Sequence, residues 1–530
     1  MPKQKKQRLS WFLVKPGIDV DHPTAIIESK DGLTSFKIPA LSKERDSLFV
    51  RASHPSPPRW LGYVQGHIEG DGLPAILGAS SSGVLLIEAK ERLLAIAFGY
   101  GRHLIRQEAV VQDFGLKVVL NSIDPELIKS VDARTFDELT IHTRRGASRD
   151  SSLGAFELDN SRDLLRAVTG RSEPGGLGAL SGAASLAMNT TEELPQLPAL
   201  AADLLKAYRK TAYRKNFGFI DHMRGEQDPV VITKLDEKLV KALGDREMTA
   251  MHLAIPEAVD WQEISGVRFS FKKRRHEPEP DPRISIYREL RDGEEIKIER
   301  LKGDRVEAIS SVDEDQIVGK WRVYDCLVFE TEHAGHLYVL SGGDWYRIAK
   351  TYRDRVEEYI KGVPELEIEL PGADSSQDER TYNEAAAKQI GGLCLDGKTV
   401  GISGPDRVEI CDLLTKDGYF IHVKKRSRSS TLSHLFAQGV TSAELLLDDD
   451  EFRKEAAAKI AEIGAGFKSA IPKKLGEREK IKVAYVVLSR GQRPDKPYGL
   501  PFFSLVSLKT ATERLRRAGI DVSVKEVKES

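Results

Sequence analysis

The C-terminal part of the chain carries the pattern that most constrains the fold, because apolar strand-like runs alternate there with helix-like runs. Helical spacing marks residues 381–390, 429–447, 452–464 and 507–519, and β-branched or apolar runs mark residues 398–402, 407–414, 419–426, 482–489 and 521–527. The resulting order is α-β-β-β-α-α-β-α-β, which predicts helices layered on a sheet. We therefore expect an α/β domain over residues 376–530.

Three further domains are expected before it, which makes the chain an α+β multidomain protein. Residues 1–125 are predicted to be β-rich from runs at 9–14, 25–29, 46–52, 83–89 and 92–100, with a hairpin tip at Lys90 and Glu91. Residues 126–265 are predicted to be mainly helical, with helices at 163–170 and 197–213. Residues 266–375 are predicted to be a β-rich middle domain, with strands at 283–290, 295–301, 305–311 and 336–348 before a helix at 353–363.

Composition excludes several classes of protein. The 80 Lys and Arg nearly balance the 81 Asp and Glu, and 40% of the residues are hydrophobic, which excludes a wholly disordered chain, a collagen and a mucin-like stalk. Cys326, Cys394 and Cys411 have no paired spacing, so we expect neither a disulfide framework nor a thiolate zinc site, and we expect a reducing cytoplasm. The apolar run at the N-terminus is too short for a signal peptide, and no apolar stretch reaches the roughly 18–20 residues that cross a membrane.

Five polar residues of the C-terminal domain fall where a catalytic site could assemble. Asp412 lies in one predicted strand, and Lys424 lies in the next, two residues after His422. Glu384 lies in the first predicted helix, and Gln438 lies in the helix that follows the strands. This element order and these positions resemble the PD-(D/E)XK nuclease superfamily, which has a restriction-endonuclease-like fold. The resemblance implies Mg²⁺-dependent phosphodiester cleavage, although His422 stands where the superfamily has an acid.

The chemistry explains why such residues are needed together. Mg²⁺, or Mn²⁺, prefers carboxylates and water, and Asp412 and Glu384 are the metal ligands that the resemblance implies. The cation would polarise the phosphate and lower the pKa of the attacking water, while Lys424 would stabilise the developing charge. His422 is a poorer ligand for Mg²⁺ than a carboxylate, so the cation would rest mainly on Asp412, with Gln438 in support. The same departure is equally consistent with weakened or lost catalysis.

The register of the two central strands decides whether these side chains meet. A two-residue turn at Asp417 and Gly418 would place Asp412 and His422 on opposite faces of the sheet. A three-residue loop over 416–418, with Gly418 in the left-handed region, would pair Asp412 with His422 instead. We favour the three-residue loop, which also gathers the apolar neighbours on the other face.

Each of these residues also has a purely structural interpretation. Asp412 could form an ion pair with Lys424 that holds the sheet, since a buried carboxylate is costly without a partner. His422 could be a hydrogen-bonded strand residue with no role in chemistry. Glu384 could lie on a solvated helix face, and Gln438 could be a polar residue at a helix end before Gly439.

A basic segment follows the second strand. Lys425, Arg426, Arg428, Ser429 and Ser430 could hold phosphate, or could form only a solvated turn. Residues 401–530 contain 24 Lys and Arg against 18 Asp and Glu, whereas the first 400 residues contain 56 against 63. A basic module on an acidic body is the asymmetry expected when one domain contacts nucleic acid.

Longer segments resemble a sporadically distributed bacterial family of uncharacterised function. They are residues 131–170, 207–221, 338–348 and 422–439, so the resemblance spans most of the chain. Members of that family occur near mobile elements and anti-phage defence genes, which implies a role in defence. The tract that contains His422 is similar to the family's own, so this histidine is expected to be a family feature.

The favoured function is that of an anti-phage defence protein that cleaves nucleic acid, with DNA favoured over RNA, through a degenerate PD-(D/E)XK site. The alternatives are a catalytically inactive nucleic-acid-binding sensor and a protein-interaction scaffold in a defence system. The expected partners are nucleic acid and a phage or host protein that acts as trigger, without contact with a membrane. The protein could also form a homo-oligomer.

Overall fold

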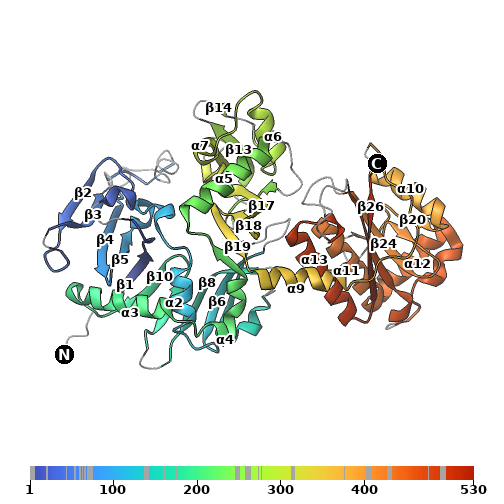
Figure 1. Cartoon of the computed structure of the whole chain (residues 1–530), viewed down its shortest axis with the longest axis horizontal. Helices are drawn as coiled ribbons and strands as arrows, with labels where there is room; N and C mark the ends of the chain where they lie inside the picture. Colours follow the sequence, from blue (N-terminus) through green and yellow to red (C-terminus); the bar gives the residue numbers. More distant parts are fainter. Residues whose placement is uncertain are drawn as a thin grey trace. The chain divides into compact units, whose positions relative to one another are not determined.

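A computed structural model gives the fold (Figure 1). It describes residues 6–529 with the exception of 19–21, 43, 53–54, 59–60, 62–63, 65–66, 69–75, 136–141, 159–162, 174–175, 245–250, 257–258, 260–263, 272–273, 276, 312–316, 375, 402–406, 426–431, 475–476 and 490–496. The chain divides into two compact units. The first consists of Met1–Arg134, Thr143–Leu158 and Leu164–Ile220, and the second consists of Thr135–His142, Asp159–Asp163 and Asp221–Ser530.

The first unit is built on a ten-stranded sheet in the order β2-β3-β4-β5-β1-β10-β9-β8-β6-β7. Neighbouring strands from β2 to β8 are antiparallel. Fully buried Trp11, Phe114 and Leu204 mark the core, which joins the sheet to the helices. The elements are β1 (Gln7–Leu13), β2 (Leu33–Lys37), β3 (Asp46–Ala52), β4 (Ser81–Ala89), β5 (Arg92–Gly99), α2 (Phe114–Leu120), β6 (Ile128–Thr135), β7 (His142–Ser151), β8 (Asp163–Arg171), β9 (Ala179–Gly182), β10 (Leu186–Thr190), α3 (Leu197–Arg209) and α4 (Arg214–Phe217).

The structure confirms the hairpin between β4 and β5 but differs from the expected organisation after residue 125. Lys90 and Glu91 both have positive φ and form the tip of the hairpin. The segment predicted to be a helix at 163–170 is strand β8, which pairs with β9. A short apolar run cannot be assigned to a helix or a strand by periodicity alone, and here cross-strand pairing decides. Strand β1 lies between β5 and β10, so residues on both sides of the expected boundary share one sheet.

The middle of the chain belongs to the second unit and forms two sheets, ordered β11-β19-β18-β17-β12 and β14-β13-β15-β16. Leu235 and Leu239 of α5 are fully buried in a core that also contains Trp345. The elements are β11 (Met223–Gly225), α5 (Pro229–Gly244), β12 (Met251–Leu253), β13 (Ile264–Phe271), β14 (Arg274–Arg275), α6 (Ile284–Leu290), α7 (Ile298–Gly303), β15 (Arg305–Ser310), β16 (Ile317–Arg322), α8 (Val323–Cys326), β17 (Leu327–His333), β18 (His336–Ser341), β19 (Asp344–Ile348) and α9 (Lys350–Lys361).

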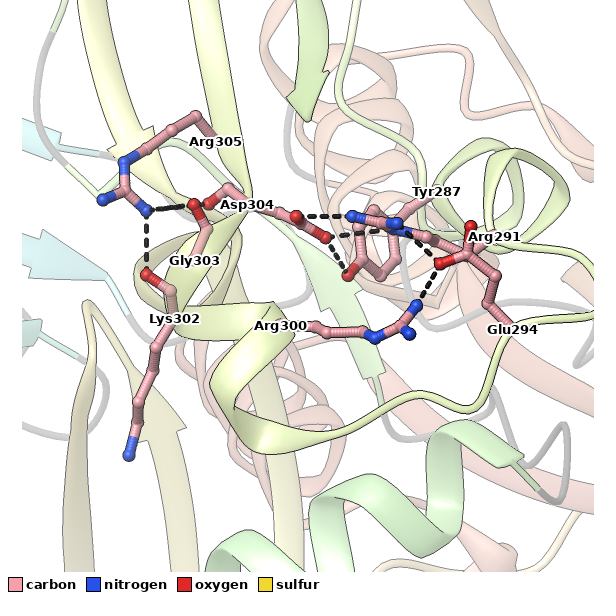
Figure 2. A network of polar contacts seen from close by, with 8 residues as sticks. All are labelled: Tyr287, Arg291, Glu294, Arg300, Lys302, Gly303, Asp304 and Arg305. Atoms are coloured by element: carbon pink, nitrogen blue, oxygen red, sulfur yellow. Dashed lines mark hydrogen bonds and ion pairs between the residues drawn. The ribbon is translucent and has the colours of Figure 1, made fainter. Parts of the chain in front are cut away.

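A polar network fastens α6 to the end of α7 (Figure 2). The Asp304 carboxylate accepts hydrogen bonds from the Tyr287 hydroxyl at 2.8 Å and from Arg291 at 2.6 and 3.2 Å. Glu294 accepts from Arg291 at 2.7 Å and also from Arg300. Tyr287 and Arg291 reach one carboxylate because they lie one helical turn apart. Residues 283–290, predicted to be a strand, form helix α6, which this contact holds in place. The predicted strand at 295–301 overlaps α7.

Replacing Asp304 by Ala should lower the free energy of unfolding by about 3 kcal/mol, because Arg291 would remain largely buried without its carboxylate partner. Chemical denaturation of the full chain would measure the loss. Glu295→Ala is the matched control, since this carboxylate is exposed and contacts only Lys297 in the described structure, at 2.9 Å. Equal losses in the two variants would show that the network does not stabilise the fold.

The C-terminal part of the second unit contains a five-stranded sheet in the order β20-β23-β24-β25-β26. The pairs β20–β23 and β23–β24 are antiparallel, and the pairs β24–β25 and β25–β26 are parallel. The elements are α10 (Glu379–Ile390), β20 (Leu393–Cys394), β21 (Thr399–Gly401), β22 (Arg407–Glu409), β23 (Leu413–Leu414), β24 (Tyr419–Lys425), α11 (Leu432–Asp448), α12 (Asp450–Gly464), β25 (Lys482–Ser489), α13 (Phe502–Arg517) and β26 (Asp521–Lys528). The four expected helices and the strands at 419–426, 482–489 and 521–527 are present, but five strands separate α10 from α11 where three were expected, because β20 precedes them and the strand predicted over 407–414 is divided into β22 and β23.

Helices cover both faces of this sheet (Figure 1). Ala386 and Ala387 of α10 pack in one apolar cluster with Ile421 and Val423 of β24. On the opposite face the Tyr485 hydroxyl donates to the Phe436 carbonyl of α11 at 2.9 Å. The sheet is therefore buried on both faces.

The favoured register of the central strands is confirmed. Leu413 pairs with Ile421 and Leu414 pairs with Phe420, so residues 416–418 form the three-residue loop. Gly418 has a φ of +79°, and a Cβ there would lie 2.2 Å from the Lys480 carbonyl oxygen. A glycine is therefore required at this turn. The paired residues end at Leu413, and the amide of Asp412 donates to the carbonyl of Ile421 at 3.0 Å, so the expected pairing of Asp412 with His422 does not continue the ladder.

Among the helices of the described residues, we find none with the length and apolar character that a membrane span requires.

Candidate metal centre

Asp412 lies where the chain leaves the sheet between β22 and β23. Its amide donates to the Ile421 carbonyl at 3.0 Å, and its own carbonyl accepts from the Leu395 amide at 2.7 Å. Its carboxylate accepts from the Val423 amide at 2.7 Å. The amide of Val423 thus bonds to the side chain of Asp412 and not to the backbone of a neighbouring strand. The strand predicted over 407–414 is accordingly split in two.

Two further carboxylates approach Asp412. Asp396 follows β20 and Glu409 ends β22, and one oxygen from each of the three residues lies within 4.8 Å of the others. All three residues are half-buried. Glu409 is held from outside the cluster because it accepts a hydrogen bond from the Gly397 amide. We call Asp396, Glu409 and Asp412 the acid triad.

The electrostatics of the acid triad disfavour three simultaneous negative charges. Burial raises the pKa of Asp412 to about 8; the Val423 amide opposes this shift, and the nearby Glu409 and Asp396 charges reinforce it. Burial also raises the pKa of Glu409, against the effect of the Gly397 amide. At neutral pH the triad therefore retains a proton unless a cation takes its place.

Lys424 contributes a positive charge beside the acid triad. Its Nζ lies 2.8 Å from Glu379, the first residue of α10, so the ion pair considered between Asp412 and Lys424 is not the one that forms. A Glu379 oxygen also accepts from the Lys425 amide at 3.3 Å. The charge of Lys424 still lowers the pKa of both Asp412 and Glu409, which places it within electrostatic reach of the triad.

His422 is buried in β24. It is 2% exposed, its ring centroid lies 6.0 Å from that of Tyr485, and burial lowers its pKa to about 4. The imidazole is therefore neutral at pH 7. Among the described residues the Nε2 atom of His422 has no hydrogen-bond partner.

The structure places the two helical candidates outside the acid triad. Glu384 is exposed, and its carboxylate lies 3.3 Å from Arg380 on the same face of α10. Gln438 is half-buried in the middle of α11, which continues to Asp448, so it is not at a helix end. Gly439 lies within this helix, and a Cβ there would lie only 2.5 Å from the hydroxyl oxygen of Tyr485, so the glycine allows close packing and does not end the helix.

The predicted phosphate-binding segment is only partly described. Lys425 Nζ donates to the carbonyls of Gln377 at 2.8 Å and Asp374 at 3.4 Å, and lies 3.4 Å from Glu529. This ammonium therefore fastens the start of α10 to β24. The remaining candidates lie outside the described residues: Arg426, Arg428, Ser429 and Ser430.

Sequence reasoning missed Asp396, Glu409 and Glu379. Glu409 was predicted to lie inside one long strand over 407–414, and the sequence does not show which residues lie beside it in space. Glu379 precedes the predicted helix by two residues, although Asp378 is a typical N-cap and its side chain accepts from the Thr381 amide at 2.8 Å. That cap was the available signal that α10 begins at Glu379.

The acid triad has the composition that a hard divalent cation requires. Mg²⁺ and Mn²⁺ prefer oxygen ligands and bind through carboxylates together with water. A cation would replace the proton that the raised pKa values retain, and it would relieve the repulsion among the three carboxylates. The residues therefore fit a divalent cation, with Asp396 and Glu409 in place of the predicted ligand Glu384.

Comparison with known families supports the expected membership of an uncharacterised family. A model described as a family of unknown function, DUF6119, matches residues 9–528. The chain belongs to this family. The match covers both compact units, so the acid triad is part of the region that DUF6119 defines. Searches of curated proteins and of solved structures found no match.

Proposed function

We propose that this DUF6119 chain is a divalent-cation-dependent nuclease whose centre is the acid triad beside Lys424. The observation that carries the proposal is the approach of three carboxylate oxygens to within 4.8 Å at the break between β22 and β23. The mixed sheet supports it, since two antiparallel pairs followed by a parallel pair fit the restriction-endonuclease-like fold that we propose for this part. Asp396 and Glu409 would supply the carboxylate that the superfamily has at the position of His422.

The chain's own residues suggest how cleavage would proceed. A cation held by Asp396, Glu409 and Asp412 would polarise a phosphodiester and activate water. Asp412 would keep its position through the Val423 amide. The Lys424 ammonium would stabilise the charge that develops on the phosphate, and Glu379 would hold it until substrate arrives.

Purified full-length protein incubated with single- and double-stranded DNA and RNA tests the proposal. We expect cleavage with Mg²⁺ or Mn²⁺, none in EDTA, and a loss of at least about 100-fold in Asp412→Asn. Asp417→Asn is the matched control, because this exposed acid lies in the loop between β23 and β24. Cleavage that is equal in Asp412→Asn and wild type would refute the assignment, as would no cleavage of any substrate.

A non-catalytic nucleic-acid-binding protein is the second candidate. The enclosed, neutral His422 in place of an acid favours it. In that case the wild type would bind DNA or RNA with an affinity that falls steeply with salt, and no cation would produce cleavage.

We further propose that the substrate is DNA and that a phage or host protein is the trigger. The family resemblance implies the context, which is anti-phage defence. Phage plating on cells that express wild type or Asp412→Asn tests this context. We expect protection by the wild type only; equal plating on both would count against it.

A further inference from the structure

Asn383 is a polar residue buried against the acid triad. It lies on α10 one turn after Glu379 and is 1% exposed. Its Nδ2 donates to the Asp396 carboxylate at 3.3 Å. Among the described residues its amide oxygen has no hydrogen-bond donor. The side chain therefore lies against Asp396 of the triad, with its amide nitrogen paired and its amide oxygen unpaired.

An unpaired amide oxygen is an unfavourable feature in this environment. The same helix buries Tyr382, Ala386 and Ala387 against the sheet, so an apolar residue would suit the packing at position 383. A buried acceptor without a donor loses its hydration and gains nothing in return. A hydrogen-bond donor that binds at this place would satisfy the amide oxygen.

We propose that Asn383 is a positioning residue of the cation site, whose amide oxygen accepts a hydrogen bond from water bound to the cation on Asp396, Glu409 and Asp412. Hard divalent cations keep several of their waters, and groups that hold those waters or the ligands alter the affinity for the metal. The amide N–H would meanwhile fix the orientation of Asp396. The inference rests on the proposed function only in requiring a cation at the acid triad.

Calorimetric titration of the full chain with Mn²⁺ or Mg²⁺ tests the proposal. Binding at the triad is the part of the signal that Asp412→Asn removes. We expect Asn383→Leu to weaken that binding by about tenfold or more, because it removes both polar groups while keeping the branched shape of the side chain. Asn383→Asp restores an oxygen acceptor and should bind the cation at least as tightly as wild type.

Tyr382→Phe is the matched control, since this neighbouring residue on α10 is equally buried and its hydroxyl donates to the Pro371 carbonyl at 3.2 Å. We expect it to alter stability without changing cation affinity. Unchanged affinity in Asn383→Leu would overturn the proposal. If that variant does not fold, Asn383→Asp decides, and a tenfold loss of its affinity would overturn the proposal instead.

The outcomes separate this inference from the nuclease assignment. Cation binding that depends on Asn383, without cleavage of any nucleic acid, would support the inference and refute the proposed activity. Cleavage that depends on Asp412 but not on Asn383 would do the reverse. A wild-type chain that binds neither Mn²⁺ nor Mg²⁺ at the triad would refute the inference.

Discussion

In cation-free buffer at pH 8, Asp412→Asn should unfold at a higher temperature than the wild type, by roughly 5–10 °C. The pKa of Asp412 is about 8 in the folded chain, whereas an unfolded Asp titrates near 3.9. Between these values the folded state holds a proton that the unfolded state has released. The stability of the wild type therefore falls by several kcal/mol as the pH rises from about 4 to about 8. The asparagine carries no charge and can still accept from the Val423 amide.

Cation should reverse the order of the two proteins. Saturating Mn²⁺ or Mg²⁺ stabilises only the folded chain that binds it, so the wild type should gain stability and Asp412→Asn should not. Thermal unfolding monitored by circular dichroism at several pH values, with cation or EDTA, would measure both effects. Burial lowers the pKa of His422 to about 4 in the folded state, so protonation of this histidine destabilises the folded protein toward low pH. This loss of stability is the same in both proteins and cancels in their difference. Parallel pH profiles for the two proteins would contradict the raised pKa.

The sequence predicted the central strands of the site for identifiable reasons. The loop over 416–418 ends in a glycine that must adopt a positive φ, and this local requirement determines the pairing of β23 with β24. Asp412 was also identifiable, because a carboxylate in an apolar run is unusual. Both signals are contained within a few neighbouring residues, so no knowledge of the tertiary fold was needed.

The rest of the acid triad depends on contacts that are distant along the chain. Asp396 and Asp412 are brought together by the hydrogen bond from Leu395 to the Asp412 carbonyl, which no local pattern encodes. Glu409 lies beside Asp396 and Asp412 because the strand is interrupted at Asp412, whose side chain bonds to the amide of Val423. The choice between Glu379 and Glu384 depended on where α10 begins, and helix ends are poorly defined by periodicity. Elsewhere in the chain, the segments predicted wrongly were short apolar runs, such as those that form α6 and β8. Periodicity does not distinguish a helix from a strand in such runs, and the packing partner decides the structure.

Lys424→Met should separate cation binding from cleavage. The Lys424 ammonium is not a ligand, and its charge opposes a nearby cation, so its removal should leave Mn²⁺ affinity unchanged or higher. Cleavage should fall by about 100-fold or more, because the charge that develops on the phosphate would lose the stabilising Lys424 ammonium. Calorimetric titration with Mn²⁺ and a single-turnover cleavage assay on the same preparation would measure the two quantities.

Lys416→Met is the matched control, since Lys416 is exposed in the loop at the other end of β24. It should change neither quantity. Glu379→Gln adds a second comparison, because it removes the charge 2.8 Å from Lys424 but leaves the ammonium in place. If Lys424→Met lost cation affinity and cleavage together, Lys424 would be holding the acid triad in shape. If it cleaved like the wild type, the positive charge that stabilises the phosphate would have to come from another residue.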